Sequence, residues 1–359
     1  MTSAVQSSAG GATSLPSSAS ISDVASLAGV SQGTVSNVLN HPERVTDVTL
    51  DRVQRAIQML NYVPNGPARS LAVGRTASFG LVLSDLSNSL FVEIASGAER
   101  AAEEAGLTLL LANSDGRLDR ENTYVRLFAE GRVAGVMLTL NDESHYRAIA
   151  RRGSPGGPLV LLNYAADPAS FCSAHIRNDV GGSMAAEHLI ETGRRRLAFI
   201  GGPSGLQPVT ERRLGFHRAL TDHGLAPVVE IDPVGVNRSD GWAVGLRLID
   251  EVKAGRVDGI FAASDLLAAG IAQAFAANDV SVPSSVGIVG YDNNQAAWDS
   301  PIPITTIGQP GDELGYRGAQ LLLREVAEPH AHRHEQIELE PTLIVRESTG
   351  AAGTRPGVR

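Results

Sequence analysis

Cysteine is almost absent from this sequence, which contains Cys172 and no other. A single cysteine excludes an intrachain disulfide and a cysteine-rich metal site, and it usually serves as buried packing. Long hydrophobic runs are also missing, since none reaches about eighteen apolar residues, the length of a transmembrane helix. Residues 1–19 contain no Lys or Arg and no apolar segment typical of a signal peptide. We therefore expect a disordered N-terminal tail and a cytoplasmic protein with no membrane partner.

The sequence also lacks the short motifs of common enzyme classes. It contains no Gly-x-Ser-x-Gly elbow, no Walker phosphate loop and no His-Glu-x-x-His zinc motif. The glycine-rich segment 201–205 follows an apolar run, but no Lys-Ser pair follows it. These absences predict a protein that is not an enzyme and has no cofactor.

Three histidines, His330, His332 and His334, alternate near the C-terminus in a pattern that can bind a metal ion. Beyond Glu335, no cysteine or acidic residue nearby in the sequence completes an evident ligand set. We therefore expect a surface loop or linker here, and no metal site.

Two short helices joined by a tight turn are predicted between Ile21 and Asn40. The first has apolar residues at helical spacing, with Ser20 or Ser22 available as its N-cap. Gly29 follows it where the chain leaves the helix, a step that favours a positive φ. Ser31 can cap the second helix. The pattern predicts a helix-turn-helix that binds DNA, although any small pair of packed helices shares it.

A third helix is predicted after this segment, and five short motifs stand between Ala28 and Leu71. Thr46 can cap a helix whose apolar residues recur every three or four positions, which would close a three-helix domain over residues 20–63. In order along the chain stand the motifs AGVS, TVS, VLN, YxPN and ARSL, the last two at Tyr62–Asn65 and Ala68–Leu71. In these motifs the sequence resembles the LacI family of bacterial transcriptional regulators. The likeness continues in GYD at 290–292, PITT at 303–306 and REST at 346–349.

Beyond residue 76, strand-length apolar runs alternate with helix-length amphipathic segments, and this rhythm restarts near Leu197. The length of 359 residues suits two or three domains, and 43% hydrophobic with 19% charged residues is typical of globular chains. We expect an all-α helix-turn-helix head followed by an α/β two-lobed core, built from two doubly wound parallel-sheet subdomains.

The resemblance implies how the chain divides, with crossings between the two lobes near residues 177, 306 and 338. The expected segments are a tail at 1–19, the head at 20–63, a hinge helix and linker at 64–75, a core for effector binding and dimerisation at 76–349, and a tail at 350–359. Within the core, the N-subdomain is expected at 76–176 and 308–337, and the C-subdomain at 178–305 and 339–347.

The outer face of the second helix is expected to enter the major groove of DNA. In the family the main base readers fall on Gln32, Gly33 and Asn37, and arginine is common at the last position. Gly33 has no side chain, and Asn37 prefers adenine where arginine prefers guanine. The residues expected to contact DNA are Ser31, Gln32, Gly33, Thr34, Ser36, Asn37, Asn40, Tyr62, Asn65, Arg69 and Leu71.

The net charge of −9 is unevenly distributed along the chain. Between Ser20 and Arg75 five arginines face four acids, which leaves the head near +1 and the remainder near −10. Because phosphate neutralisation sets non-specific DNA affinity, a single head should bind weakly, and two heads on one molecule should bind better. We expect a homodimer on a near-palindromic operator in double-stranded DNA. A tetramer is less favoured, because no heptads follow Glu347.

Polar residues follow several predicted strands, where a two-lobed α/β core binds its ligand. By resemblance, effector contacts are expected at Asp85, Leu90, Phe91, Asn163, Arg212, Ser264 and Asp292. Carboxylates, amides and one arginine suit a hydroxyl-rich sugar or sugar derivative, whereas a purine or other co-repressor is an alternative. Each polar residue could instead cap a helix or a turn. A sugar-binding protein without the DNA role is a further alternative, disfavoured by the head.

The resemblance also implies that Leu71, in the hinge, wedges between base steps in the minor groove and kinks the duplex. We predict that Leu71→Ala weakens specific binding and removes the DNA bend, as measured by binding and by the bend angle in solution. An unchanged bend angle would mean that Leu71 packs on the core instead.

Overall fold

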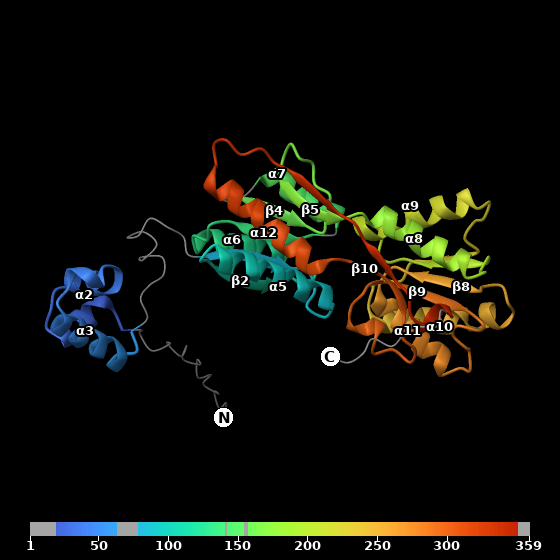
Figure 1. Ribbon diagram of the computed structural model, residues 1–359, viewed down its shortest axis with the longest axis horizontal. Coiled ribbons are helices and arrows are strands. Elements are labelled where there is room, and N and C mark those ends of the chain that lie inside the picture. Colours follow the sequence, from blue (N-terminus) through green and yellow to red (C-terminus); the bar gives the residue numbers. More distant parts are fainter. Residues whose placement is uncertain (1–18, 63–77, 141, 154–156, 351–359) are drawn as a thin grey trace, which may run out of the picture. The chain divides into compact units, whose positions relative to one another are not determined.

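The computed structural model describes residues 19–62, 78–140, 142–153 and 157–350 (Figure 1). The chain divides into two compact units, one reaching Arg75 and the other beginning at Thr76. The hinge predicted for residues 64–75, with its expected DNA contacts Asn65, Arg69 and Leu71, lies outside the described residues.

The described part of the first unit is a three-helix domain with a helix-turn-helix. Its helices are α1 (Ile21–Ala28), α2 (Gln32–Asn40), the 3-10 helix η1 (Pro42–Arg44) and α3 (Asp47–Met59). Ser20 caps α1 through a reciprocal pair of hydrogen bonds with Asp23, and Gly29 ends that helix at a φ of 64°. Ser31 caps α2 by accepting a hydrogen bond of 3.1 Å from the Thr34 amide. The predicted caps Ser20 and Ser31 and the turn at Gly29 are therefore confirmed, whereas Thr46 precedes α3 at the N-cap position but makes no capping hydrogen bond with its side chain.

The core of this domain draws on all three α-helices. Val24, Val35 and Val53 are fully buried, one from each helix, and Leu50 and Ile57 pack against them. Burial of one such side chain contributes about 1.5–3 kcal/mol. Because the core buries only the inner face of α2, the outer face of this helix does not take part in packing.

The second unit begins with a six-stranded parallel sheet, the centre of the N-terminal lobe. Its sheet order is β11-β5-β4-β3-β1-β2, and every neighbouring pair runs parallel. The elements of this lobe are β1 (Ser78–Leu83), α5 (Ser89–Glu104), β2 (Thr108–Asn113), α6 (Leu118–Glu130), β3 (Val136–Thr139), α7 (Glu143–Arg152), β4 (Leu159–Leu162), β5 (Cys172–Ile176), α12 (Gly311–Ala327) and β11 (Gln336–Leu339). One core cluster joins the sheet to α5 and α12, and another joins it to α6 and α7.

The C-terminal lobe repeats this plan with sheet order β12-β10-β9-β8-β6-β7. The last strand, β12, runs antiparallel to β10, so the sheet is not wholly parallel as the sequence led us to expect. Figure 1 shows α8 and α9 on one face of the sheet, and α10 and α11 on the other. The elements are α8 (Asn178–Glu191), β6 (Leu197–Ile200), α9 (Gln207–Asp222), β7 (Val229–Ile231), α10 (Arg238–Lys253), β8 (Gly259–Ala262), α11 (Asp265–Ala276), β9 (Gly287–Asp292), η2 (Gln295–Ala297), β10 (Thr305–Gly308), β12 (Thr342–Ile344) and η3 (Glu347–Thr349).

Three connections join the two lobes, and two of them lie further along the chain than predicted. The first is at Arg177, between β5 and α8. The other predicted crossings, near residues 306 and 338, fall inside strands β10 and β11. Thr306 and Gly308 still pair with β9, and Leu339 still pairs with β5, so the chain leaves each sheet only when this pairing ends.

Helices α8 and α9 approach each other closely through glycines, and this contact positions the middle of α9. A Cβ on Gly215 would lie 1.8 Å from the Asp179 carbonyl oxygen, and one on Gly182 would lie 2.0 Å from the Arg212 carbonyl oxygen. Both obstacles are backbone atoms, which cannot rotate away. The backbone of Arg212 is therefore held against α8.

We predict that Gly215→Ala destabilises the core unit by about 3 kcal/mol, because the methyl group forces α8 and α9 apart. Denaturant unfolding of the purified protein measures this change. Leu214→Ala is the matched control, since Leu214 lies next to Gly215 but is 62% exposed, and it should cost less than about 0.5 kcal/mol. Equal stability of the two variants would contradict the close-packing argument.

Candidate functional site

Helix α2 carries a polar outer face that is free to meet DNA. Gln32, Gly33 and Asn37 are exposed, whereas Val35 and Val38 on the same helix are buried in the domain core. The burial pattern thus separates a packing face from an exposed face, and the three residues expected to read bases share the exposed face.

Other expected DNA contacts on the head already have intramolecular roles. Ser31 and Thr34 hydrogen-bond each other through their hydroxyl groups at 2.9 Å as part of the α2 cap. Asn40 donates to the Ser36 carbonyl oxygen at 3.1 Å, which ties its side chain to the end of α2. Tyr62 packs against the hydrophobic core of the domain.

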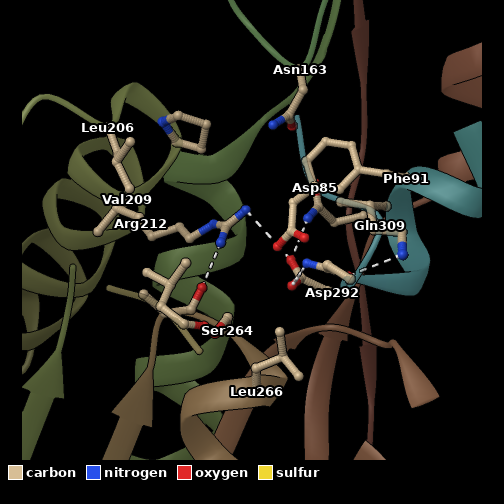
Figure 2. Close-up of a pocket in the computed structure, with 15 residues that line it drawn as sticks. Asp85, Phe91, Asn163, Leu206, Val209, Arg212, Ser264, Leu266, Asp292 and Gln309 are labelled. Atoms are coloured by element: carbon tan, nitrogen blue, oxygen red, sulfur yellow. Dashed lines mark hydrogen bonds and ion pairs between the residues drawn. The ribbon is translucent and has the colours of Figure 1, made fainter. Parts of the chain in front are cut away.

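In the core unit, one cavity between the lobes brings together all seven residues expected to contact an effector. The cavity holds about 570 Å³ of empty space, part of it open to solvent. Figure 2 shows Arg212 and Asp292 facing each other across it, with Phe91 and Asn163 nearby. The lining residues are Asp85, Asn88, Leu90, Phe91, Asn163, Leu206, Pro208, Val209, Arg212, Val236, Ala263, Ser264, Leu266, Asp292 and Gln309.

Arg212, on α9, is the only cationic side chain in this lining, and it is 5% exposed. Its Nε donates to Asn178 Oδ1 at 2.9 Å, and its Nη1 donates to the Ala263 carbonyl oxygen at 2.5 Å. Its guanidinium carbon stands 3.6 Å from the centroid of the Tyr291 ring, a cation–π contact. These partners from three elements hold the guanidinium group in one orientation.

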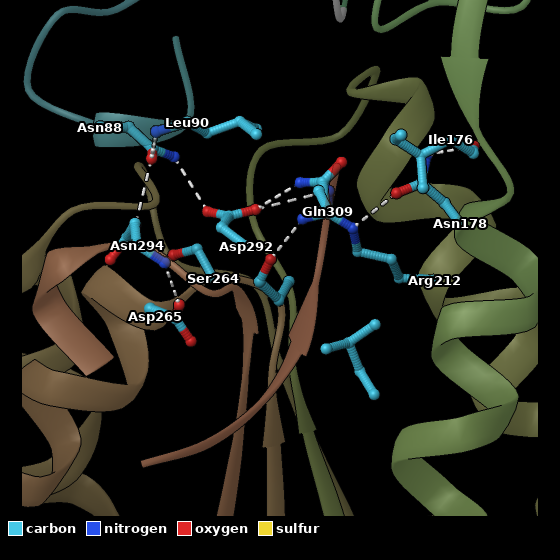
Figure 3. Close-up of polar contacts among 12 residues, drawn as sticks. Asn88, Leu90, Ile176, Asn178, Arg212, Ser264, Asp265, Asp292, Asn294 and Gln309 are labelled. Carbon is cyan, nitrogen blue, oxygen red and sulfur yellow. Dashed lines mark hydrogen bonds and ion pairs between the residues drawn. The ribbon is translucent and has the colours of Figure 1, made fainter. Parts of the chain in front are cut away.

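Asp292 ends strand β9 and is the matching anion, 4% exposed. One carboxylate oxygen accepts from Asn88 Nδ2 at 2.9 Å and the other from Gln309 Nε2 at 2.6 Å (Figure 3). Arg212 Nη2 stands 3.8 Å from Asp292 Oδ1, an ion pair longer than a hydrogen bond. Burial raises the pKa of Asp292, while Arg212 and the two amide donors act in the opposite direction.

Three of the other predicted residues sit at strand ends in the ways that the helix-cap and turn alternatives describe. Ser264 caps α11 by accepting from the Leu267 amide at 3.2 Å, and its hydroxyl donates to the Val236 carbonyl oxygen. Asp85 accepts hydrogen bonds from the Ser87 amide and hydroxyl. Asn163 has a φ of 60°, and its Oδ1 is buried with no hydrogen-bond partner among the described residues. These three residues therefore have local structural roles and also line the cavity.

The two lobes touch directly on either side of this cavity. Asn88, at the start of α5, contacts both Asp292 and Asn294 of the other lobe, the latter at 3.1 Å. Further contacts run from the Gln295 amide to Ser89 Oγ at 3.2 Å, from the Ala165 amide to Gln207 Oε1 at 2.8 Å, and from the Glu143 amide to the Gly205 carbonyl oxygen at 3.0 Å. Hydrogen bonds thus connect the lobes in addition to the three covalent crossings.

Asn88 and Gln309 were not among the expected effector contacts. Asn88 follows the first strand of the core, so its position among the strand-end polar residues was a usable signal. Gln309 lies on the second crossing, where no strand-end pattern marks it. The apolar wall formed by Leu206, Val209 and Val236 also went unpredicted, because nothing in a sequence distinguishes cavity lining from core.

Within the described part of the chain, no helix combines the length and the apolar character that a bilayer crossing requires.

Comparison with known proteins gives the same organisation. The family model of bacterial regulatory proteins, lacI family, matches residues 20–65, and a periplasmic binding protein-like domain matches residues 186–349. The HTH-type transcriptional repressor PurR of Aliivibrio salmonicida is 31% identical over 92% of this chain and 98% of its own length. The ribose operon repressor of Escherichia coli K12 is 32% identical over 92% of this chain and 99% of its own length.

Two solved structures are similar to this chain in fold. The transcriptional regulator CelR in complex with cellobiose is 30% identical, covers 92% of this chain and 99% of its own, and superposes with a TM-score of 0.68. The lac repressor dimer bound to operator and the anti-inducer ONPF is 25% identical, covers 93% and 99%, and gives a TM-score of 0.77. A helix-turn-helix head joined to a two-lobed ligand-binding core, with relatives of this identity along nearly the whole chain, places the protein in the LacI family of bacterial transcriptional regulators, which are not enzymes.

Proposed function

We propose that this protein is a dimeric repressor whose operator binding is controlled by a sugar or sugar derivative held between the lobes of its core. Membership of the family supplies the DNA-binding role and the effector-binding core. The effector class, the dimer and the contacts of individual residues are our proposals.

The observation that carries the sugar proposal is the mixture of unpaired acceptors and donors around one cavity. Asn163 Oδ1 and Gln309 Oε1 are buried and lack hydrogen-bond partners among the described residues, and Arg212 Nη2 stands 3.8 Å from Asp292 Oδ1, which is longer than a hydrogen bond. Leaving a buried acceptor unpaired costs about 1–3 kcal/mol. A sugar hydroxyl donates one hydrogen bond and accepts others, so several hydroxyls on one ring satisfy both kinds of group.

A purine base is the second candidate effector. One of the compared relatives, PurR, favours a purine, whereas the ribose operon repressor favours a sugar. The repressor PurR and the ribose operon repressor have nearly equal identity to this chain. A flat base needs stacking partners, and Phe91 is the one aromatic residue in the described lining. The Phe91 ring can pack against the face of a sugar as well as against a base. We therefore base the preference for a sugar on the polar groups of the cavity.

Control of DNA binding would follow from lobe closure. The Asn88–Asp292 contact and the Ala165–Gln207 contact both join opposite lobes. A ligand bound among these groups would change the free energy of the contact between the lobes. Because coupling is reciprocal, a ligand that weakens operator binding must itself bind the DNA complex more weakly. The sign, inducer or co-repressor, is set by which lobe arrangement the ligand stabilises.

We predict that the effector raises the thermal stability of the protein. At a ligand concentration about 100 times its dissociation constant, the free energy of unfolding rises by about 2.7 kcal/mol. The assay is a thermal-shift screen with D-ribose, cellobiose, other sugars and sugar phosphates, guanine and hypoxanthine, followed by operator titration with each hit. Stabilisation by a purine alone would refute the sugar proposal and leave the DNA role intact.

The same screen tests the cavity through one isosteric substitution. Asp85→Asn keeps the local turn with Ser87 but removes the charge, so we expect the affinity for the effector to fall by about tenfold or more. Asp115→Asn is the matched control, because Asp115 follows β2 of the same sheet, at a φ of 58°, outside the cavity lining. An equal loss of effector affinity in both variants would show that Asp85 does not act by contacting the ligand.

For DNA, we propose that Gln32 and Asn37 read bases from the exposed face of α2. Ser31, Thr34 and Ser36 would lie towards phosphates, with Asn40 and Tyr62 further along the interface. The near-neutral head gives one copy little phosphate attraction, which supports a dimer on a near-palindrome.

We predict that unbiased selection of bound DNA returns adenine at the base facing Asn37, and that Asn37→Arg shifts this position to guanine, with about 1–3 kcal/mol of discrimination. Gln54→Arg is the control for added charge, because Gln54 is exposed on α3. It should raise affinity for all sequences without changing the preferred base. Guanine as the preferred base of the unaltered protein would contradict the assignment of Asn37.

A further inference from the structure

A second cluster of polar side chains lies in the N-terminal lobe, away from the interlobe cavity. It consists of Cys172 at the start of β5, Glu325 in the last turn of α12, and His332 and His334 in the loop before β11. The four offer one sulfur, one carboxylate oxygen and two imidazole nitrogens, and these atoms all lie within 4.8 Å of one another. We propose that Cys172, Glu325, His332 and His334 bind one Zn²⁺ ion.

This proposal differs from the expectation from the sequence that His330, His332 and His334 lie in a surface loop without a metal site. That expectation rested on the lack of a cysteine or acid that completes the set. Folding supplies both, because Cys172 is 160 residues before His332 in the chain and Glu325 lies on the preceding helix. His330, the other alternating histidine, is exposed and stands outside the cluster.

The spacing of the ligand atoms suits a tetrahedral ion. Zinc bonds of about 2.0–2.3 Å place neighbouring ligand atoms roughly 3.3–3.8 Å apart. Cys172 Sγ and His332 Nε2 are 3.0 Å apart, and His332 Nε2 and Glu325 Oε2 are 3.8 Å apart. Small side-chain rotations are therefore enough to centre an ion among the four groups.

Two polar atoms of this cluster lack a hydrogen-bond partner, whereas Cys172 Sγ and His332 Nε2 lie within hydrogen-bond distance of each other. Glu325 Oε2 and His334 Nδ1 are buried and have no hydrogen-bond partner among the described residues. Cys172 is fully buried, and the His332 side chain is 8% exposed. Buried polar atoms without partners cost free energy, and a cation bound between them removes this cost.

Three features of the surroundings support a metal ion at this place. The Glu335 amide donates to Cys172 Sγ at 3.3 Å, a hydrogen bond that stabilises a thiolate ligand. Arg324 holds the Glu335 carboxylate through two contacts of 3.2 Å, which fixes this part of the loop. A cavity that includes His332, Arg333 and Glu335 in its lining adjoins the cluster and offers an entry path.

The ligand types select among metals. A thiolate and two imidazoles favour Zn²⁺ over Mg²⁺ or Ca²⁺, which prefer oxygen ligands. The ion would fasten the loop after α12 to the beginning of β5, directly before β11 pairs with that strand. Its role would be structural, since all four positions are filled by protein.

The test uses the full-length protein, purified without a polyhistidine tag and treated with a chelator. Titration with Co²⁺ as a spectroscopic substitute should give the visible bands of a tetrahedral ion and a thiolate-to-metal charge-transfer band at one equivalent. Zn²⁺ should displace Co²⁺ and raise the thermal stability of the protein. Absence of the charge-transfer band, or binding only through exposed sites at several equivalents, would overturn the proposal.

Variants separate this site from general histidine binding. Cys172→Ala should abolish the charge-transfer band, and His334→Gln, on the loop, should lower the affinity for Zn²⁺ by more than about 100-fold without disturbing the buried sheet. His330→Gln is the matched control and should bind both ions as the unaltered protein does. Retention of one-equivalent binding in His334→Gln, or its loss in His330→Gln, would refute the assignment. Because His334→Gln spares the core, its result stands even where Cys172→Ala unfolds.

Discussion

The buried pair formed by Arg212 and Asp292 is the interaction on which the core of this protein depends. Each ion is nearly excluded from water, and a buried charge is tolerated only when paired and hydrogen-bonded. The partners come from both lobes and one crossing: Asn178 on α8, Ala263 after β8, Asn88 on the opposite lobe and Gln309 on the crossing. The pair therefore couples the internal order of one lobe to its contact with the other.

This network explains why the cavity and the lobe contacts are inseparable. Asn88 uses its amide nitrogen on Asp292 and its amide oxygen on the Leu90 backbone and on Asn294, so it caps α5 while it bridges the lobes. A ligand that competes for any of these groups must change the free energy of lobe contact as well. Such coupling is the physical basis of the effector control that we propose for this member of a family of transcription regulators.

Much of the fold was predictable because it follows from local chemistry. Ser20, Gly29 and Ser31 mark the ends of the first helices through caps and a left-handed turn, which a few neighbouring residues determine. The seven expected cavity residues came from the family resemblance, supported by polar residues at strand ends. Prediction was weaker where pairing between distant segments decides the outcome: β10 and β11 run past the expected crossings, and β12 runs antiparallel.

The sequence by itself determined the helix-turn-helix, the alternation of strands and helices, and the membership of a regulator family, since periodicity and short motifs act over a few residues. The tertiary structure alone decided that Gln309 faces Asp292, and that Cys172 and Glu325 join His332 and His334. The physical reason is that these groups meet only after β5, α12 and the late strands pack into one lobe. The separation of two residues along the chain does not predict whether they come into contact, whereas the packing of strands and helices in the folded lobe determines it.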